Sequence, residues 1–208
     1  MDSFIVGFWK SIFSAAFRMT PFGLLSCRWN FTHRMVDAWV LGHFFLAILA
    51  WVLLPITGYD LLRKTVGCYA IWRIAEIVIY QVNTILFDPF KSSAYALRSY
   101  RRSVLLAMQN FAEVFFWFAA IYKIFANHFD KADILKSLVG SIYFSAVTMA
   151  TLGYGDITPL RNSTFGRMVV VCHVCVGFFL SVIVIARFIS LLPRPGTMAP
   201  DENEVSQN

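Results

Sequence analysis

The sequence has little charge for its length. Asp, Glu, Lys and Arg make up 14% of the 208 residues, whereas soluble domains carry roughly 25%. Hydrophobic residues reach 58%, Phe alone occurs 21 times, and the mean hydropathy is +0.63. These values exclude an ordinary soluble domain and predict an integral membrane protein.

Cysteine is also scarce, and no internal repeat is visible. The four cysteines lie in or beside apolar segments, so we expect no disulfide framework: Cys27, Cys68, Cys172 and Cys175. The spacing Cys172-x-x-Cys175 resembles half of a zinc site, but no second pair lies nearby, which disfavours a metal. The first apolar run lacks the small-residue cleavage site of a secretory signal, so none is expected.

Four apolar segments are long enough to cross a bilayer, which takes about 20 helical residues. They are Ala38–Ile56, Val66–Phe87, Ser103–Ala126 and Met168–Leu192. The last is followed by Pro193, and proline does not continue a helix. Between the third and fourth spans, Ile134–Ala150 is apolar but too short to cross.

Basic residues are distributed as in a protein with both termini in the cytoplasm. The net charge is +6, but no soluble segment carries a basic patch, so no nucleic acid partner is expected. With cytoplasmic termini, most Lys and Arg residues outside the spans fall on the cytoplasmic side, as the positive-inside rule favours. We therefore predict a multi-pass protein of the cell membrane.

Two further segments are expected to lie at the membrane surface. Within and just after Phe4–Phe17, polar residues recur at every fourth position, which predicts an interfacial helix: Lys10, Ser14 and Arg18. Phe90–Arg102 is basic, and we expect its arginines to contact anionic lipid headgroups. The tail Gly196–Asn208 is short, polar and acidic, and is predicted to be disordered.

The stretch Thr151-Leu-Gly-Tyr-Gly-Asp156 follows the short apolar segment. Each glycine weakens a helix by roughly 1 kcal/mol relative to alanine, so this stretch is not helical. Non-helical backbone at membrane depth must be buried in protein or line a water-filled path. Carbonyl oxygens along such a path can replace the hydration shell of a cation, and Gly153 and Gly155 can adopt the backbone angles that this needs.

This stretch resembles the signature filter of potassium channels, with Leu152 where valine is common. The preceding Ser141–Thr148 resembles the pore helix of that family, with Val147 where some bacterial channels have a glutamate. Asp156-Ile-Thr-Pro159 resembles the exit from the filter, and Gly166-Arg167 the start of the inner helix. The resemblance covers roughly Ser103–Leu192, and residues 1–102 match no family.

The resemblance implies a role for each residue of the filter. The ion-binding residues would be Thr151, Leu152, Gly153, Tyr154 and Gly155. The carbonyls of the first four would coordinate potassium, and the Thr151 hydroxyl would complete the innermost site. Asp156 would attract cations at the outer mouth. Tyr154 would point backwards into an aromatic cuff formed by Tyr143 and Phe144.

The resemblance also implies roles along the last span. Gly177 falls at the position of the hinge glycine of the family. Three residues would face the cavity below the filter: Phe178, Ser181 and Ile185. Ile185 and Ile189 would form a hydrophobic gate that closes by dewetting. Because one filter strand supplies one wall of a pore, the chain is expected to form a homotetramer.

The predicted fold is an all-α integral membrane protein with four transmembrane helices and a re-entrant pore helix and filter between the third and fourth. Its regions would be an interfacial amphipathic segment (1–37), a two-span peripheral domain with a cytoplasmic linker (38–102), a pore domain (103–192) and a disordered cytoplasmic tail (193–208). Conduction is passive, so neither an enzyme activity nor a cofactor is expected. Potassium is the permeant ligand.

Ionisable residues within the spans are interpreted as structural. Arg73 has Glu76 one turn later, and one arginine is too few for a voltage sensor. Glu113 is expected to bond to Arg73 or Asn83. The histidines in the spans are expected to be packed and hydrogen-bonded rather than pH sensors: His43 and His173.

Two alternatives stay open at this stage. A non-selective cation channel would share the pore but usually lacks the filter tyrosine, so Tyr154 argues against it. A non-conducting or regulatory subunit that needs a partner is harder to exclude. The tail is too short for a folded ligand-binding domain, so a regulatory domain would have to come from another chain.

Overall fold

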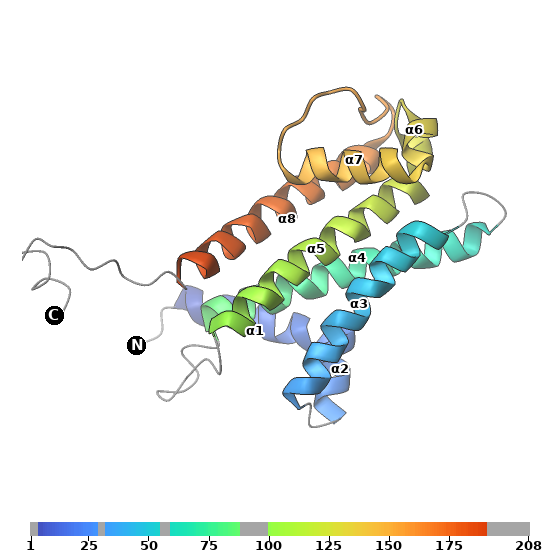
Figure 1. Cartoon of the computed structure of the whole chain (residues 1–208). Coiled ribbons are helices and arrows are strands. Elements are labelled where there is room, and N and C mark those ends of the chain that lie inside the picture. The colour runs from blue at the N-terminus through green and yellow to red at the C-terminus, as the bar shows by residue number, and fades with distance from the viewer. Residues whose placement is uncertain (1–3, 29–31, 55–58, 88–99, 191–208) are drawn as a thin grey trace, which may run out of the picture.

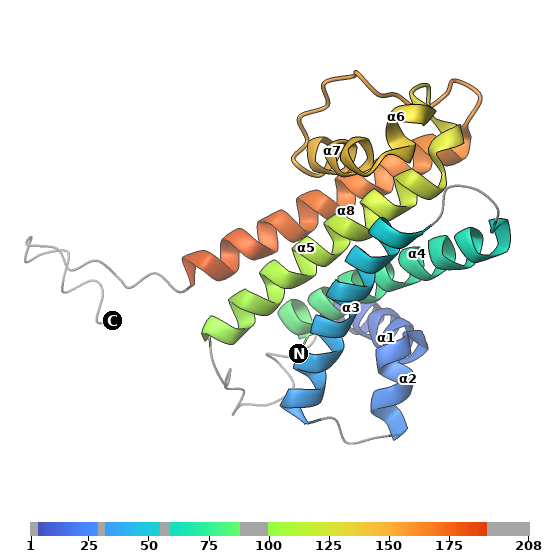
Figure 2. The ribbon, with the colours of Figure 1, turned by 45° about the vertical axis from the view of Figure 1, so that its right-hand side comes forward.

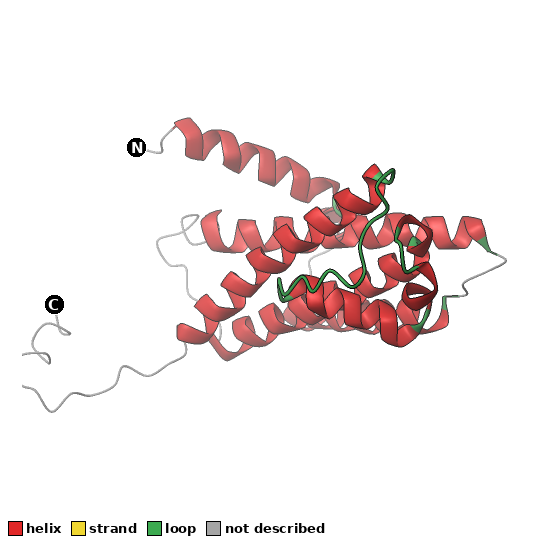
Figure 3. Cartoon of the chain, turned by 90° about the horizontal axis from the view of Figure 1, so that it is seen from above, coloured by secondary structure: helices red, strands yellow, loops and turns green. Residues whose placement is uncertain are grey.

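The computed structural model describes residues 4–28, 32–54, 59–87 and 100–190, which fold into helices and loops without strands among them (Figure 3). The first part of the chain forms α1 (Phe4–Met19), α2 (Pro21–Arg28), α3 (His33–Leu53), α4 (Asp60–Val82) and the π-helical turn η1 (Asn83–Phe87). The second part forms α5 (Tyr100–Ile124), the 3-10 turn η3 (Ala126–His128), α6 (Ala132–Lys136), α7 (Leu138–Met149) and α8 (Thr164–Ile189).

Among the described residues, 4 helices are long and apolar enough to cross a membrane. They cover Arg34–Leu53, Asp60–Phe87, Arg101–Ile124 and Thr164–Ile189. The predicted all-α fold with four apolar helices of spanning length is thereby confirmed. All four helices begin earlier than the apolar runs because their first turns include polar residues that a hydropathy pattern does not count.

Helix α5 lies at the centre of the bundle. It packs against α3, α4, α7 and α8, and Figures 1 and 2 show it between the α3–α4 pair and α8. Its buried side chains include Val114, Trp117, Phe118 and Tyr122. Between membrane helices, close packing and interhelical hydrogen bonds supply the attraction that water exclusion supplies in soluble proteins.

Helix α7 lies across the end of α5 and α8 and contacts both (Figures 1 and 2). Ser137 separates it from α6, and the Ser137 hydroxyl accepts a hydrogen bond from the Gly140 amide at 2.9 Å, which caps the helix. A Cβ at Gly140 would lie 2.1 Å from the Ile134 carbonyl oxygen. The apolar segment Ile134–Ala150 is therefore folded back on itself at Ser137.

The N-terminal helices pack at the other end of the bundle. The segment Phe4–Phe17 is helical, as predicted, and forms most of α1. This helix has no buried residue and contacts α2, α4 and η1. Its place at a membrane interface remains a prediction. The sequence did not predict α2. Most of the basic linker Phe90–Arg102 and the whole tail 193–208 lie outside the described residues.

Candidate functional site

The filter segment (Thr151–Asp156) connects the end of α7 to the loop that leads into α8. Its backbone angle φ is +56° at Thr151, +57° at Gly153 and +74° at Gly155, and no other described residue has φ in the left-handed region. The sign of φ thus alternates along the segment. The glycine conformation predicted from the sequence is confirmed, whereas the left-handed Thr151 was not foreseen.

Conformation rather than crowding explains the glycines of the filter segment. A Cβ at Gly153 or Gly155 would meet no atom within 4 Å, but an L-residue in this region costs roughly 1–2 kcal/mol. Thr151 adopts the left-handed conformation because backbone hydrogen bonds hold the chain on either side of its peptide groups. Its amide donates to the Thr148 carbonyl at 3.1 Å, and the Leu152 amide donates to the Val147 carbonyl at 3.0 Å.

The C-terminal end of the α7 dipole lies next to the filter segment. A helix C-terminus carries roughly half a negative charge, and α7 ends at Met149, with Ala150 alone between the helix and the segment. The Ser145 hydroxyl anchors this helix by donating to the Phe115 carbonyl of α5 at 2.8 Å. The arrangement therefore directs a negative potential towards the backbone of Thr151.

Two hydrogen-bonded carboxylates hold the chain as it leaves the filter segment. Asp156 accepts a hydrogen bond from the Tyr143 hydroxyl at 2.7 Å, and this bond raises the pKa of Tyr143. Asp130 accepts one from the Thr158 amide at 2.8 Å, and this bond lowers the pKa of Asp130. These two bonds tie the chain that follows the filter segment to α7 and to the loop before α6.

The predicted aromatic cuff is only partly present within one chain. Phe144 is buried and packs in the core, with its ring centroid 4.6 Å from that of Tyr122 and 5.5 Å from that of Phe129. Tyr154 is 66% exposed and makes no described ring contact with Tyr143 or Phe144. It shares with Phe144 the lining of a cavity of about 250 Å³ between the filter segment, α7 and α8.

Helix α8 places the predicted cavity and gate residues as follows. Phe178, Ile185 and Ile189 are exposed, and their spacing puts them on one face of the helix. The Ser181 hydroxyl instead donates to the Gly177 carbonyl at 2.8 Å. The helix runs unbroken through Gly177, where a Cβ would lie 3.1 Å from Met149 Cγ. Gly177 therefore permits close packing on α7, and its role as a hinge stays a prediction.

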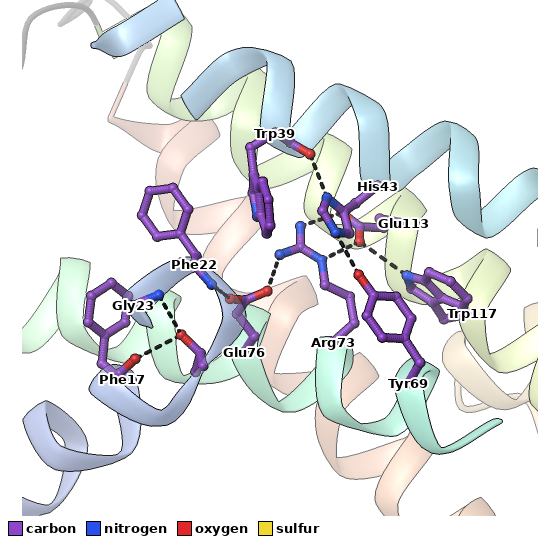
Figure 4. A network of polar contacts seen from close by, with 11 residues as sticks. Phe17, Phe22, Gly23, Trp39, His43, Tyr69, Arg73, Glu76, Glu113 and Trp117 are labelled. Atoms are coloured by element: carbon purple, nitrogen blue, oxygen red, sulfur yellow. Dashed lines mark hydrogen bonds and ion pairs between the residues drawn. The ribbon is translucent and has the colours of Figure 1, made fainter. Parts of the chain in front are cut away.

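A buried ionic cluster joins α4 to α5 (Figure 4). Arg73 donates from Nε to Glu113 Oε1 at 2.7 Å and from Nη2 to Glu113 Oε2 at 3.0 Å. Its Nη1 bonds to Glu76, whose other oxygen accepts the Phe22 amide of α2 at 2.6 Å. The predicted pairing of Arg73 with Glu76 is confirmed, and of the two partners considered for Glu113 the structure selects Arg73.

The two histidines are packed and hydrogen-bonded, as predicted. His43 Nδ1 lies 2.7 Å from the Trp39 carbonyl oxygen and Nε2 lies 2.7 Å from the Tyr69 hydroxyl. His173 Nδ1 lies 2.9 Å from the Tyr122 hydroxyl, and its ring stacks on Phe118.

Sequence reasoning missed the hydrogen bonds that join the first span, α3, to α7 and to α5. The Trp51 indole of α3 donates to the Ser141 hydroxyl of α7 at 2.9 Å. Lys123 donates to the Trp51 carbonyl at 2.9 Å, where a cation complements the helix end. The position of Lys123 near the end of an apolar span was the one feature of the sequence that could have indicated such a contact.

Comparison with known proteins assigns the second half of the bundle to a family. The family described as "Ion channel" matches residues 104–194, which include α5 except its first turn, α7, the filter segment and α8. The matched segment is therefore similar to ion channels.

Curated relatives make the class more specific. The chain is 32% identical over 69 residues to "Potassium channel protein kcv" of Paramecium bursaria Chlorella virus 1, covering 30% of this chain and 71% of the viral protein. It is 39% identical over 56 residues to "Potassium channel KOR1" of Oryza sativa subsp. japonica, covering 26% of this chain and 6% of the rice protein. The chain belongs to the potassium channel superfamily.

A third relative also matches over a short segment. "Protein LctB" of Bacillus caldotenax is 33% identical over 55 residues, which cover 26% of this chain and 39% of that protein. Thus the aligned segments span well under half of both the rice and the Bacillus proteins. No solved structure matches the chain significantly.

Proposed function

We propose that this chain is a subunit of a homotetrameric, potassium-selective channel that conducts passively through the filter segment. The observation that carries the proposal is the alternating sign of φ from Thr151 to Gly155. Alternation of the sign of φ allows successive carbonyl groups to point to the same side of the segment, and glycine permits the positive values. The carbonyls of Thr151, Leu152, Gly153 and Tyr154 would then replace the hydration shell of potassium.

The surroundings of the filter segment favour a cation. The negative end of α7 faces it, and Asp156 lies at its outer end, where the Tyr143 hydroxyl fixes the carboxylate. In the tetramer, α7 and the filter segment form a re-entrant loop. Tyr154, exposed in the single chain, would pack against the aromatic residues of a neighbouring copy.

Below the filter, the exposed face of α8 would line the pore. Phe178 would face the cavity, with Ile185 and Ile189 forming a ring that stops conduction by dewetting when it narrows. The chain would lie in the cell membrane with both termini in the cytoplasm and with anionic lipids near Arg101. Potassium is the permeant ligand, and the proposal requires no cofactor.

Purified protein in liposomes tests the proposal. We expect native mass spectrometry to give four copies per particle, and single-channel recording of the protein alone to show potassium currents. A silent but correctly assembled tetramer would favour a subunit that needs a regulatory partner. Equal sodium and potassium fluxes would favour a non-selective cation channel.

A further inference from the structure

Three helices of the second half of the bundle meet at the hydroxyl of Tyr122. Tyr122 of α5 and His173 of α8 are both 0% exposed, and His173 Nδ1 lies 2.9 Å from the Tyr122 hydroxyl oxygen. The Thr148 side chain of α7 faces the same hydroxyl as a second hydrogen-bond partner. A hydroxyl can donate one hydrogen bond and accept two, so Tyr122 can serve both neighbours at once.

Thr148 is the point at which this contact reaches the filter segment. Its carbonyl accepts a hydrogen bond from the Thr151 amide at 3.1 Å, and the carbonyl of the preceding Val147 accepts one from the Leu152 amide at 3.0 Å. Thr148 also lines the cavity of about 250 Å³ that the filter segment borders. A shift of the last turn of α7 would therefore change the backbone of the first two filter residues.

Helix α8 holds the end of α7 at a second point, one turn further along. Gly177 lies four residues after His173, on the same face of α8, and both residues are buried. A Cβ at Gly177 would lie 3.1 Å from Met149 Cγ and 3.3 Å from the Met149 carbonyl oxygen, so the backbone of α8 closely approaches the last residue of α7. These two contacts fix the position at which α7 ends.

Packing alone does not explain a histidine at position 173. The His173 ring stacks on Phe118, with ring centroids 3.8 Å apart and 10° between the ring planes, a contact that an apolar ring could also make. Its Nε2 has no hydrogen-bond partner among the described residues, and a buried polar atom without a partner destabilises a fold. What the histidine adds here is the bond to Tyr122.

We propose that His173 is a positioning residue of the filter segment. Through Tyr122 it holds the Thr148 side chain, and it thereby keeps the end of α7 and the backbone of Thr151 in the conformation that binds potassium. The proposal rests on the proposed function of the filter segment and places no contact between His173 and the ion. Loss of the bond between Tyr122 and His173 should weaken potassium binding, beyond any loss of fold stability.

Thermal unfolding of the purified, full-length protein in detergent tests the proposal without requiring conduction. KCl replaces NaCl stepwise at constant total salt, and the rise in melting temperature with potassium gives an apparent Kd, because a ligand that binds the folded state stabilises it by mass action. Tyr122→Phe removes only the hydroxyl. We expect it to raise this Kd by about threefold to tenfold, the factor for one interhelical hydrogen bond in a membrane.

Tyr69→Phe is the matched control. It also removes a hydrogen bond between a tyrosine and a histidine, the one to His43 Nε2 at 2.7 Å, but this bond joins α4 to α3, away from the filter segment. Tyr69→Phe should lower the melting temperature in NaCl and leave the Kd for potassium unchanged. A merely structural role of Tyr122 would produce the same pattern.

Two substitutions of His173 repeat the test from the other side of the bond. His173→Leu should raise the Kd as Tyr122→Phe does, whereas His173→Asn, whose amide can hydrogen-bond to Tyr122, should restore most of the affinity. An unchanged Kd in Tyr122→Phe and His173→Leu, or an equal rise in Tyr69→Phe, would overturn the role of His173 and leave the filter proposal standing. Equal stabilisation of the unsubstituted protein by potassium and sodium would overturn both.

Discussion

Gly155 offers the sharpest test of the proposal that backbone carbonyls of the filter segment coordinate potassium. We predict that Gly155→Ala abolishes selective conduction, because its left-handed backbone, with φ of +74°, costs alanine roughly 1–2 kcal/mol in each copy. Single-channel recording measures the effect. Gly42→Ala is the matched control, since a Cβ there also meets open space but lies within α3. A Gly155→Ala channel that remains strongly potassium-selective would argue against the account.

Asp130 gives a pH-dependent prediction at the same scale. The hydrogen bond from the Thr158 amide lowers the pKa of Asp130 in the folded protein. The stabilisation by ionised Asp130 is therefore fully present above the unfolded pKa of about 3.9 and is lost as pH falls through the lower pKa of the folded protein. We expect Asp130→Ala to destabilise the protein at pH 7 by less than about 1 kcal/mol, because the site is exposed.

Thermal unfolding in detergent at pH 7 and at low pH measures this difference. The difference between Asp130→Ala and the unsubstituted protein should vanish when the carboxyl is protonated. Asp133→Ala serves as the control, because the Asp133 side chain is 100% exposed and forms an exposed pair with Lys136 rather than a bond to a backbone amide. An Asp130→Ala effect that is the same at both pH values would contradict the hydrogen-bond explanation.

At the scale of elements, a hydrogen bond links the first span, α3, to α7, the helix that precedes the filter segment. Trp51→Phe keeps the ring but removes the donor to Ser141. We expect a loss of about 0.6 kcal/mol, the average for interhelical hydrogen bonds in membranes, and a faster decay of current during sustained conduction. Unfolding in detergent and patch recording measure the two effects.

A double-mutant cycle separates the loss of the Trp51–Ser141 hydrogen bond from destabilisation that does not depend on this bond. Trp51→Phe and Ser141→Ala should be less than additive, because each removes the same bond. Trp72→Phe is the control, since Trp72 is 47% exposed on α4. Strict additivity in both stability and current decay would show that the bond does not couple the two helices.

At the scale of the whole molecule, one ionic cluster joins the N-terminal helices, the peripheral span α4 and the central helix α5. We predict that Arg73→Met destabilises the protein by about 3–5 kcal/mol, because it leaves two buried carboxylates without a cation. Adding Glu76→Gln and Glu113→Gln to Arg73→Met should recover part of the lost stability.

Lys136→Met is the control. It breaks an exposed pair and should cost at most about 1 kcal/mol. Equal losses of stability for Arg73→Met and Lys136→Met would contradict the account.

Local patterns explain what the sequence could predict. The length of apolar runs predicted four spans, and the spacing of Gly153 and Gly155 predicted their backbone conformation, because both depend on neighbouring residues alone. The pair formed by Arg73 and Glu76 is separated by less than one helical turn, so the sequence alone could suggest it.

Distant contacts explain what could not be predicted. The Phe22 amide reaches Glu76 across 54 positions, and Trp51 reaches Ser141 across 90, so no local periodicity encodes either bond. The packing of Tyr154 is a different case. Its 66% exposure in one chain fits a side chain whose partners, in the proposed tetramer, belong to another copy.

Bi-ionic reversal potentials of the purified protein in planar bilayers test the central claim most directly. With potassium on one side and sodium on the other, the account predicts a large reversal potential of the sign set by permeant potassium, because the carbonyls of Thr151 to Tyr154 would replace the hydration shell of potassium but not that of sodium. A reversal potential near zero, which means equal permeability to the two ions, would contradict the account.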